Sequence, residues 1–240
     1  MLNSHSIKVL AFDLDGTLTQ HKEKLSEKHK NTLDLLSEKY QLLMVGAGTC
    51  QRIFDQMGKY PISIIGNYGM QYSVYQNGEL KEVYSATQSV NKELIESRVS
   101  KLREKFGFKD YTGESVEYHP SGCLTFPILG TKALQKDKLA FDPDRSRRRA
   151  IYQDVKNSFP EYTVFVGGSS SFDFAPKPYN KAYALEKWCA NNRYSHNEVV
   201  YFGDDYGLGG NDEAVYLSEF SFVPIDNYND FSELSLNFLK

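Results

Sequence analysis

Short apolar runs alternate with segments of helical spacing in the first third of the chain. Three such runs occupy residues 9–12, 41–45 and 62–65. Apolar runs of this length, bounded by turn residues, are typical of buried strands in a parallel sheet. Apolar residues at mostly helical spacing predict a helix over residues 25–40, and another follows at residues 51–58. The pattern therefore predicts an α/β fold with a parallel sheet.

The middle of the chain has a different pattern. Asn77-Gly78 between two alternating segments predicts a β-hairpin, which closes the first part of the chain. After it, the spacing predicts a helix over residues 93–106, with Leu94, Ile95 and Val99 on its apolar face, and another over 147–159. Strands are predicted over 116–119, 123–129, 162–166 and 171–175. This mixture favours an α+β insert.

The last segment returns to the α/β pattern. A helix is predicted over residues 181–189 and a strand over 199–202. We therefore expect a core domain made of residues 1–84 and 179–240, with residues 85–178 as an inserted domain.

Two carboxylates follow the first predicted strand directly, at Asp13 and Asp15. In open α/β sheets, ligands bind beyond the carboxyl ends of the strands. Two adjacent carboxylates repel each other unless a cation lies between them, and Mg²⁺ prefers such oxygen ligands. Asp13 could then attack a phosphorus atom, and Asp15 could act as general acid and base. The alternative is a solvated acidic turn.

A second acidic group, at Asp204, ends the strand over residues 199–202. Together with Asp13 and Asp15 it would complete an oxygen-rich metal site. Lys181 could neutralise charge near Asp13 and the transferring group. Alone, either feature would be an ordinary turn or surface lysine.

Composition excludes several other classes. The chain has 240 residues, of which 40% are hydrophobic and 25% charged, and a net charge of −3. This gives no broad attraction to nucleic acid or to anionic membranes. The three cysteines have no metal or disulfide spacing, and we see no signal peptide or membrane span, so a cytoplasmic protein is expected. The arginine-rich run at residues 145–149 is interpreted as a solvated helix face.

These motifs carry a family resemblance. Asp13-Leu14-Asp15-Gly16-Thr17, Lys181, Gly203-Asp204-Asp205 and Asn211-Asp212 match the haloacid dehalogenase superfamily in order. Over nearly its whole length the chain resembles the eukaryotic-type phosphomannomutases, most specifically at Gly167-Gly168, Ser171-Phe172-Asp173 and Gly209-Gly210-Asn211-Asp212.

The resemblance implies a Rossmann-like core with a parallel sheet plus an inserted α+β cap domain. It implies that Asp13 is the nucleophile and Asp15 the acid and base. It places Mg²⁺ on Asp13, the Asp15 backbone carbonyl and Asp204. It also implies a small phosphate ester as substrate and a homodimer formed through the cap.

Candidate substrate-binding residues follow partly from the resemblance and partly from departures from it. They are Lys22, Thr49, His119, Lys138, Ser171, Asp173 and Asn211. Mutases of this family hold a distal phosphate with cap arginines, whereas His119, Thr131 and Lys138 stand at the matching positions here. Lys22 replaces a core arginine. The second superfamily motif normally offers a Ser or Thr, and Ala47-Gly48 stands there, with Thr49 as the neighbouring hydroxyl.

Because lysine lacks the fork by which arginine binds a phosphate, these departures favour hydrolysis of a sugar phosphate or similar ester. The first alternative is a phosphomannomutase, which isomerises hexose 1-phosphate and 6-phosphate. The second is a sugar-phosphate binding protein without catalysis.

Overall fold

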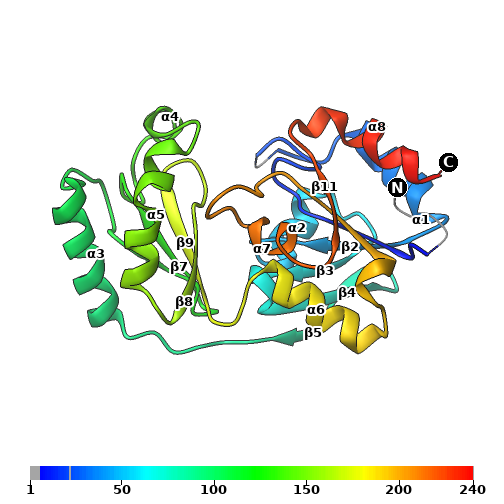
Figure 1. Ribbon diagram of the computed structural model, residues 1–240, viewed down its shortest axis with the longest axis horizontal. Coiled ribbons are helices and arrows are strands. Elements are labelled where there is room, and N and C mark those ends of the chain that lie inside the picture. Colours follow the sequence, from blue (N-terminus) through cyan, green and yellow to red (C-terminus); the bar gives the residue numbers. More distant parts are fainter. Residues whose placement is uncertain (1–5, 22, 240) are drawn as a thin grey trace. The chain divides into compact units, whose positions relative to one another are not determined.

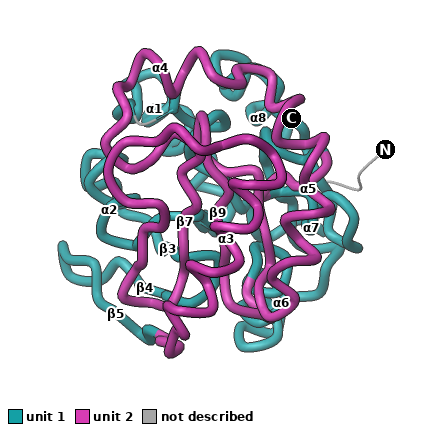
Figure 2. The backbone as a smooth tube through the Cα atoms, turned by 90° about the vertical axis from the view of Figure 1, so that its left-hand side faces the viewer, with its two compact units in different colours: residues 1–85, 180–207, 212–240 teal, residues 86–179, 208–211 magenta. Residues whose placement is uncertain are grey.

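The computed structural model describes residues 6–21 and 23–239, so Lys22 lies outside the described residues. The chain divides into two compact units (Figure 2). The first contains Met1–Ser85, Asn180–Gly207 and Asp212–Lys240, and the second contains Ala86–Tyr179 and Leu208–Asn211. Among the described residues, no helix combines the length and apolar character needed to cross a bilayer.

The first unit is built on a seven-stranded sheet in the order β11-β10-β1-β2-β3-β4-β5. Figure 1 labels β2, β3, β4, β5 and β11 of this sheet. The parallel strands are β1 (Val9–Phe12), β2 (Gln41–Val45), β3 (Ser63–Gly66), β10 (Val199–Gly203) and β11 (Ser221–Pro224). An antiparallel hairpin of β4 (Gln71–Gln76) and β5 (Glu79–Ser85) extends one edge.

Helices on the first unit complete a core on both faces of this sheet. They are α1 (Glu27–Ser37), α2 (Cys50–Gln56), α6 (Lys181–Asn192), α7 (Glu213–Tyr216) and α8 (Phe231–Leu236), with 3-10 turns at Asn67–Gly69, His196–Glu198, Tyr228–Asp230 and Asn237–Leu239. Strand β1 is apolar throughout because both of its faces are buried. Leu10 and Phe12 enter one buried cluster, and Val9 and Ala11 enter the other.

The second unit has its own antiparallel four-stranded sheet in the order β6-β7-β9-β8. These strands are β6 (Glu117–Tyr118), β7 (Leu124–Pro127), β8 (Tyr162–Phe165) and β9 (Ser171–Pro176). Its helices are α3 (Lys92–Phe106), α4 (Gln135–Phe141) and α5 (Ser146–Ser158). A separate buried cluster fills this unit, including Val99, Phe126, Val155 and Phe172.

The predicted α/β fold with a mostly parallel sheet is confirmed, but two predictions about side chains are wrong. Leu94 was expected on the apolar face of its helix, and it is 42% exposed because the buried stripe runs through Ile95 and Val99. Arg148 was expected to be solvated and is only 1% exposed. Its guanidinium pairs with Asp142 at 2.8 Å and donates to backbone carbonyls, so its polar atoms are satisfied within the core.

Candidate active site

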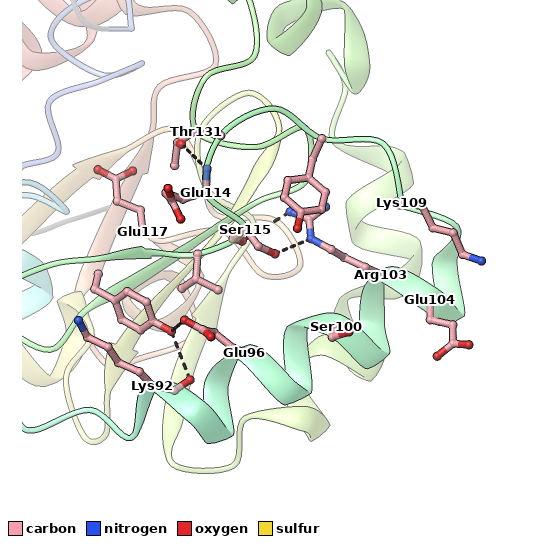
Figure 3. A pocket seen from close by; sticks show the side chains of 14 residues that line it. Lys92, Glu96, Ser100, Arg103, Glu104, Lys109, Glu114, Ser115, Glu117 and Thr131 are labelled. Atoms are coloured by element: carbon pink, nitrogen blue, oxygen red, sulfur yellow. Dashed lines mark hydrogen bonds between the residues drawn. The ribbon is translucent and has the colours of Figure 1, made fainter.

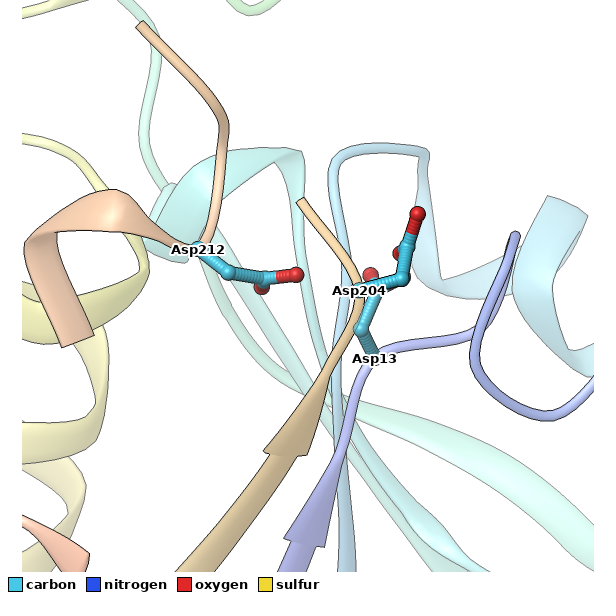
Figure 4. Close-up of side chains that lie close together, drawn as sticks. All are labelled: Asp13, Asp204 and Asp212. Carbon is cyan, nitrogen blue, oxygen red and sulfur yellow. The ribbon is translucent and has the colours of Figure 1, made fainter. Parts of the chain in front are cut away.

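Three carboxylates converge beyond the carboxyl ends of neighbouring strands in the first unit (Figure 4). Asp13 follows β1 and Asp204 follows β10, and these strands pair in parallel with Phe12 opposite Phe202. Asp212 precedes α7 and points toward them. One oxygen from each carboxylate lies within 4.8 Å of the others. Parallel pairing thus brings together acids that are far apart in sequence.

A buried lysine links two of these carboxylates. Lys181 is the first residue of α6, whose N-cap is the side chain of Asn180, and it is 0% exposed. Its Nζ donates to Asp13 Oδ1 at 2.5 Å and to Asp212 Oδ1 at 2.7 Å. Asp212 also accepts from the Tyr201 hydroxyl at 2.6 Å and from the Asp205 backbone N–H at 3.1 Å. Asp212 is therefore fixed by donors from three segments.

The carboxylates of Asp13, Asp204 and Asp212 outnumber the ammonium of Lys181 that lies against them. Burial, partly opposed by Lys181, raises the pKa of Asp13 to about 7. Burial and the neighbouring charges of Asp13 and Asp212 raise the pKa of Asp204 to about 8. Burial disfavours a charged Lys181, yet the two aspartates outweigh it and raise its pKa. Buried carboxylates that repel one another are the hard oxygen donors that suit Mg²⁺, so the residues present fit a divalent cation.

The side chain of Asp15 has a different environment from that of Asp13. Its carboxylate accepts from Gln56 Nε2 at 2.7 Å and lies 3.3 Å from Arg52 Nη2, both on α2. The clustered carboxylates are those of Asp13, Asp204 and Asp212, and the Asp15 side chain is not among them. The resemblance gives Asp15 a metal-binding role through its backbone carbonyl, so Asp13, Asp15 and Asp204 as metal ligands stay a prediction, with Asp212 as a further carboxylate beside them.

Thr49 serves as the N-cap of α2, where its hydroxyl accepts from the Arg52 backbone N–H at 3.1 Å. Thr17 approaches the acidic cluster instead, since its hydroxyl donates to Asp204 Oδ1 at 3.4 Å. A substrate role for Thr49 stays a prediction.

In the second unit, three polar side chains form a row across neighbouring strands. They belong to His119, which follows β6, Thr125 on β7 and Asp173 on β9. Thr125 on β7 donates its hydroxyl hydrogen to Asp173 Oδ1 at 2.9 Å, and it lies 3.1 Å from His119 Nε2. Because a threonine hydroxyl has one hydrogen, His119 Nε2 is the donor in the second bond. Asp173 lies against Gly167, where an added Cβ would be 1.9 Å from its Oδ2. Burial raises the pKa of Asp173.

The other predicted binding residues of this unit have hydrogen-bond partners within the same unit. Lys138 Nζ donates to the Thr131 carbonyl at 3.1 Å, and the Thr131 hydroxyl accepts from the Glu114 N–H at 2.9 Å. Ser171 Oγ donates to the Gly167 carbonyl at 3.1 Å. Asn211 belongs to the short segment Leu208–Asn211, which is grouped with this unit.

A pocket of about 1160 Å³ lies between α3 and the segment that follows it in the second unit (Figure 3). Of the predicted positions, only Thr131 lines it. Its walls carry charges of both signs, including Lys92, Glu96 and Glu117. In its mixed charges this pocket therefore differs from the cluster of Asp13, Asp204 and Asp212.

Comparison with known proteins decides the family. The model of the eukaryotic phosphomannomutase family matches residues 29–223. The chain belongs to the eukaryotic phosphomannomutase family. It is thus an enzyme of the haloacid dehalogenase superfamily and is assigned phosphoryl-transfer chemistry.

Individual relatives agree with this assignment. The chain is 27% identical to a phosphomannomutase of Saccharomyces cerevisiae, over 88% of this chain and 85% of the relative. It is 26% identical to phosphomannomutase 1 of Dictyostelium discoideum, over 94% and 96%. These matches cover most of both chains.

Solved structures share the fold at lower identity. An IMP-nucleotidase of Plasmodium falciparum superposes with a TM-score of 0.70 at 13% identity, covering 99% of this chain and 69% of that one. A protein of Plasmodium vivax described as a HAD/COF-like hydrolase gives a TM-score of 0.63 at 14% identity, covering 98% and 95%. At this identity, the likeness shows the fold alone.

Three side chains of this phosphomannomutase-family site were not predicted as functional from the sequence. Asp212 is part of the motif Gly209-Gly210-Asn211-Asp212 that carries the resemblance, but the sequence gives it no role of its own. Tyr201 looked like one more apolar strand residue. Arg52 looked like an exposed helix residue, and its contact with Asp15 depends on how α2 packs against the sheet.

Proposed function

We propose that the protein transfers a phosphoryl group of a hexose phosphate through Asp13. The supporting observation is the separation of the two acids that follow β1. Asp13 joins Lys181 and the buried acidic cluster, whereas Asp15 is held by Gln56 and Arg52. Two carboxylates in different environments suit two roles, nucleophile and acid–base group.

In this proposal, a carboxylate oxygen of Asp13 attacks the phosphorus atom and the bond from phosphorus to the ester oxygen breaks. Asp15 gives its proton to the leaving oxygen. A hydroxyl then attacks the aspartyl phosphate, and Asp15 takes the proton of that hydroxyl. Lys181 stays bound to Asp13 and Asp212 and offsets part of their charge. Bound by Asp13, Asp204 and Asp212, with the Asp15 carbonyl as the further proposed ligand, Mg²⁺ would stabilise charge that develops on the phosphoryl oxygens.

We propose isomerisation of hexose 1-phosphate and 6-phosphate as the reaction, because the family model and the relatives are phosphomannomutases. Residues of the second unit, with Ser171, Asp173 and His119 foremost, would bind the sugar part of the substrate. Pairing of two chains through this unit also stays a proposal.

Hydrolysis is the second candidate, and one observation favours it. The Thr131 side chain carries no positive charge, and the Lys138 ammonium already donates to the Thr131 carbonyl. A mutase must hold a second phosphate firmly, and neither side chain offers the planar fork of arginine. Weaker retention of the phosphorylated sugar would leave the aspartyl phosphate open to water.

A product assay separates the candidates. The protein is given mannose 1-phosphate and Mg²⁺, with and without hexose 1,6-bisphosphate, and both free phosphate and mannose 6-phosphate are measured. Faster formation of mannose 6-phosphate supports the mutase, and faster release of phosphate supports the hydrolase. Asp13→Asn is the blank. No Mg²⁺-dependent turnover of hexose phosphates would contradict both and support a binding protein.

A further inference from the structure

Arg52 adopts a conformation that depends on the glycine before its helix. Its guanidinium lies over the backbone of Gly48, where an added Cβ would be 2.2 Å from Nε and 2.6 Å from Nη2. Gly48 is not among the glycines with positive φ, so the backbone itself does not require glycine there. The space that a side chain at position 48 would fill is occupied by Arg52.

The same guanidinium reaches the acid–base residue. Arg52 Nη2 lies 3.3 Å from Asp15 Oδ2, and Nη1 donates to Gln56 Oε1 at 2.8 Å. A guanidinium has five N–H donors, and these contacts use two of them. The Arg52 side chain is 43% exposed, so other donors face solvent.

The carboxylates at this edge of the sheet would repel an incoming phosphate unless a cationic side chain lies beside them. The loop that carries Gly48 follows β2, which pairs in parallel with β1, so it lies beside the segment that carries Asp13. Lys181 is fully buried between Asp13 and Asp212, and its charge is already engaged. An incoming phosphate dianion would meet several carboxylates, and an exposed guanidinium offers it two parallel N–H donors.

We propose that Arg52 binds the transferring phosphoryl group, in the place that a hydroxyl side chain at position 48 would otherwise occupy. This inference rests on the proposed function of Asp13. Before substrate binds, Arg52 holds Asp15. When substrate binds, its remaining donors contact phosphoryl oxygens while the contact with Asp15 is kept.

The variants Arg52→Ala, Arg52→Lys, Gly48→Ser and Gly48→Ser/Arg52→Ala test the proposal, with Gln51→Ala as the control on the exposed face of the same helix. We expect Arg52→Ala to lower kcat/KM about 100-fold, the size of a lost oxyanion donor. Arg52→Lys should recover only part of this, because an ammonium lacks the fork. Gln51→Ala should match wild type.

The serine variants supply a rescue. Gly48→Ser alone should lower activity, because its Cβ displaces the guanidinium. In the Arg52→Ala background the same change should raise kcat/KM, because the hydroxyl enters the vacated space. If serine at position 48 lowers or leaves unchanged the activity of Arg52→Ala, the proposal is wrong.

Two readouts distinguish phosphate binding from orientation of Asp15. An aryl phosphate with a good leaving group needs little acid catalysis, so Arg52→Ala should slow it as much as a hexose phosphate. The Kd of inorganic phosphate with Mg²⁺, measured by calorimetry, should rise at least 10-fold. An unchanged Kd together with normal aryl phosphate turnover would overturn the proposal. Since calorimetry needs no turnover, it tests Arg52 even if wild type proves inactive and the proposed function fails.

Discussion

At the scale of single residues, the site is governed by how buried charges are balanced. Lys181 and the Tyr201 hydroxyl both donate to Oδ1 of Asp212, and all three residues are 0% exposed. A buried carboxylate without such donors would be costly. The position of Lys181 against Asp13 therefore depends on Asp212, which depends in turn on Tyr201.

Replacing Tyr201 by Phe removes only that hydroxyl. A hydrogen bond to a charged group contributes roughly 1.5–3 kcal/mol, so we expect the free energy of unfolding to fall by about 2 kcal/mol. Urea unfolding measures this. Tyr194→Phe is the matched control, because its hydroxyl donates to Gln41 at 2.7 Å on the exposed surface. Equal losses for the two variants would contradict the buried network.

Unlike the Tyr201 hydroxyl, the Asp204 carboxylate should destabilise the metal-free protein, because it adds to the repulsion between Asp13 and Asp212. Without metal, Asp204→Asn should therefore raise the melting temperature. With Mg²⁺ the order of the two melting temperatures should reverse, because a ligand that binds only the folded state stabilises it more the more tightly it binds. Thermal melts with EDTA and with Mg²⁺ measure both effects. A wild-type Mg²⁺ shift in Asp204→Asn would exclude Asp204 as a ligand.

Residues that directly follow a predicted strand could be recognised as site residues from the sequence alone. Asp13 and Asp204 each end an apolar run, and parallel pairing brings strand ends together. Arg52 and Tyr201 could not be identified in this way, because their roles depend on contacts between elements. Arg148 shows the same limit, since only the folded second unit surrounds it with Asp142 and backbone carbonyls.

At the scale of elements, the strands were predicted better than the short helices. Strand β2 has the predicted bounds, and the hairpin of β4 and β5 turns at Asn77-Gly78 as expected. Helix α4 has no buried residue, so its sequence carries no apolar stripe to reveal it. A helix without such a stripe is hard to recognise from periodicity.

Helix α6 carries Lys181 and is tied to its neighbours by His196. The imidazole bonds Glu186 of α6 at 2.8 Å and Glu219, before β11, at 3.0 Å. These hydrogen bonds, Glu186 first, raise the pKa of His196 above 6.5. Because the folded state holds the proton more tightly, the stabilisation is complete below pH 6.5 and is lost as pH rises through the folded pKa.

We therefore expect wild type to lose stability relative to His196→Gln between about pH 6 and 8. The difference should be below about 1 kcal/mol, because the cluster is partly exposed and screened by solvent. Urea unfolding at several pH values measures it. Glu219→Gln should reduce the pH dependence. A pH-independent difference between wild type and His196→Gln would contradict this role.

At the scale of the whole molecule, each unit holds a different part of the proposed chemistry. The first unit contains the acidic cluster, Lys181 and Asp15. The second contains the row of His119, Thr125 and Asp173. The chain passes between the units near residues 85 and 180 and again on both sides of Leu208–Asn211, and each unit has its own buried cluster. Changes in the second unit can then alter the fate of the intermediate without altering the nucleophile.

The double variant His119→Arg/Thr131→Arg tests this division. It places planar, bidentate donors where the resemblance puts cap arginines, so a phosphorylated sugar should be retained longer. We expect the ratio of mannose 6-phosphate formed to phosphate released to rise, while the rate of aryl phosphate hydrolysis changes little. Thr131→Arg also removes the acceptor for the Glu114 N–H, so a stability loss of about 1 kcal/mol is expected.

His119→Gln/Thr131→Ser is the matched control, because it changes the same positions without adding a guanidinium. It should leave the product ratio near that of wild type. If the arginine variant folds, hydrolyses aryl phosphate normally and still shows the wild-type ratio, these positions do not bind the distal phosphate. If the control raises the ratio equally, the guanidinium groups are not the cause. A rise confined to the arginine variant would identify phosphate retention by the second unit as the step that divides isomerisation from hydrolysis.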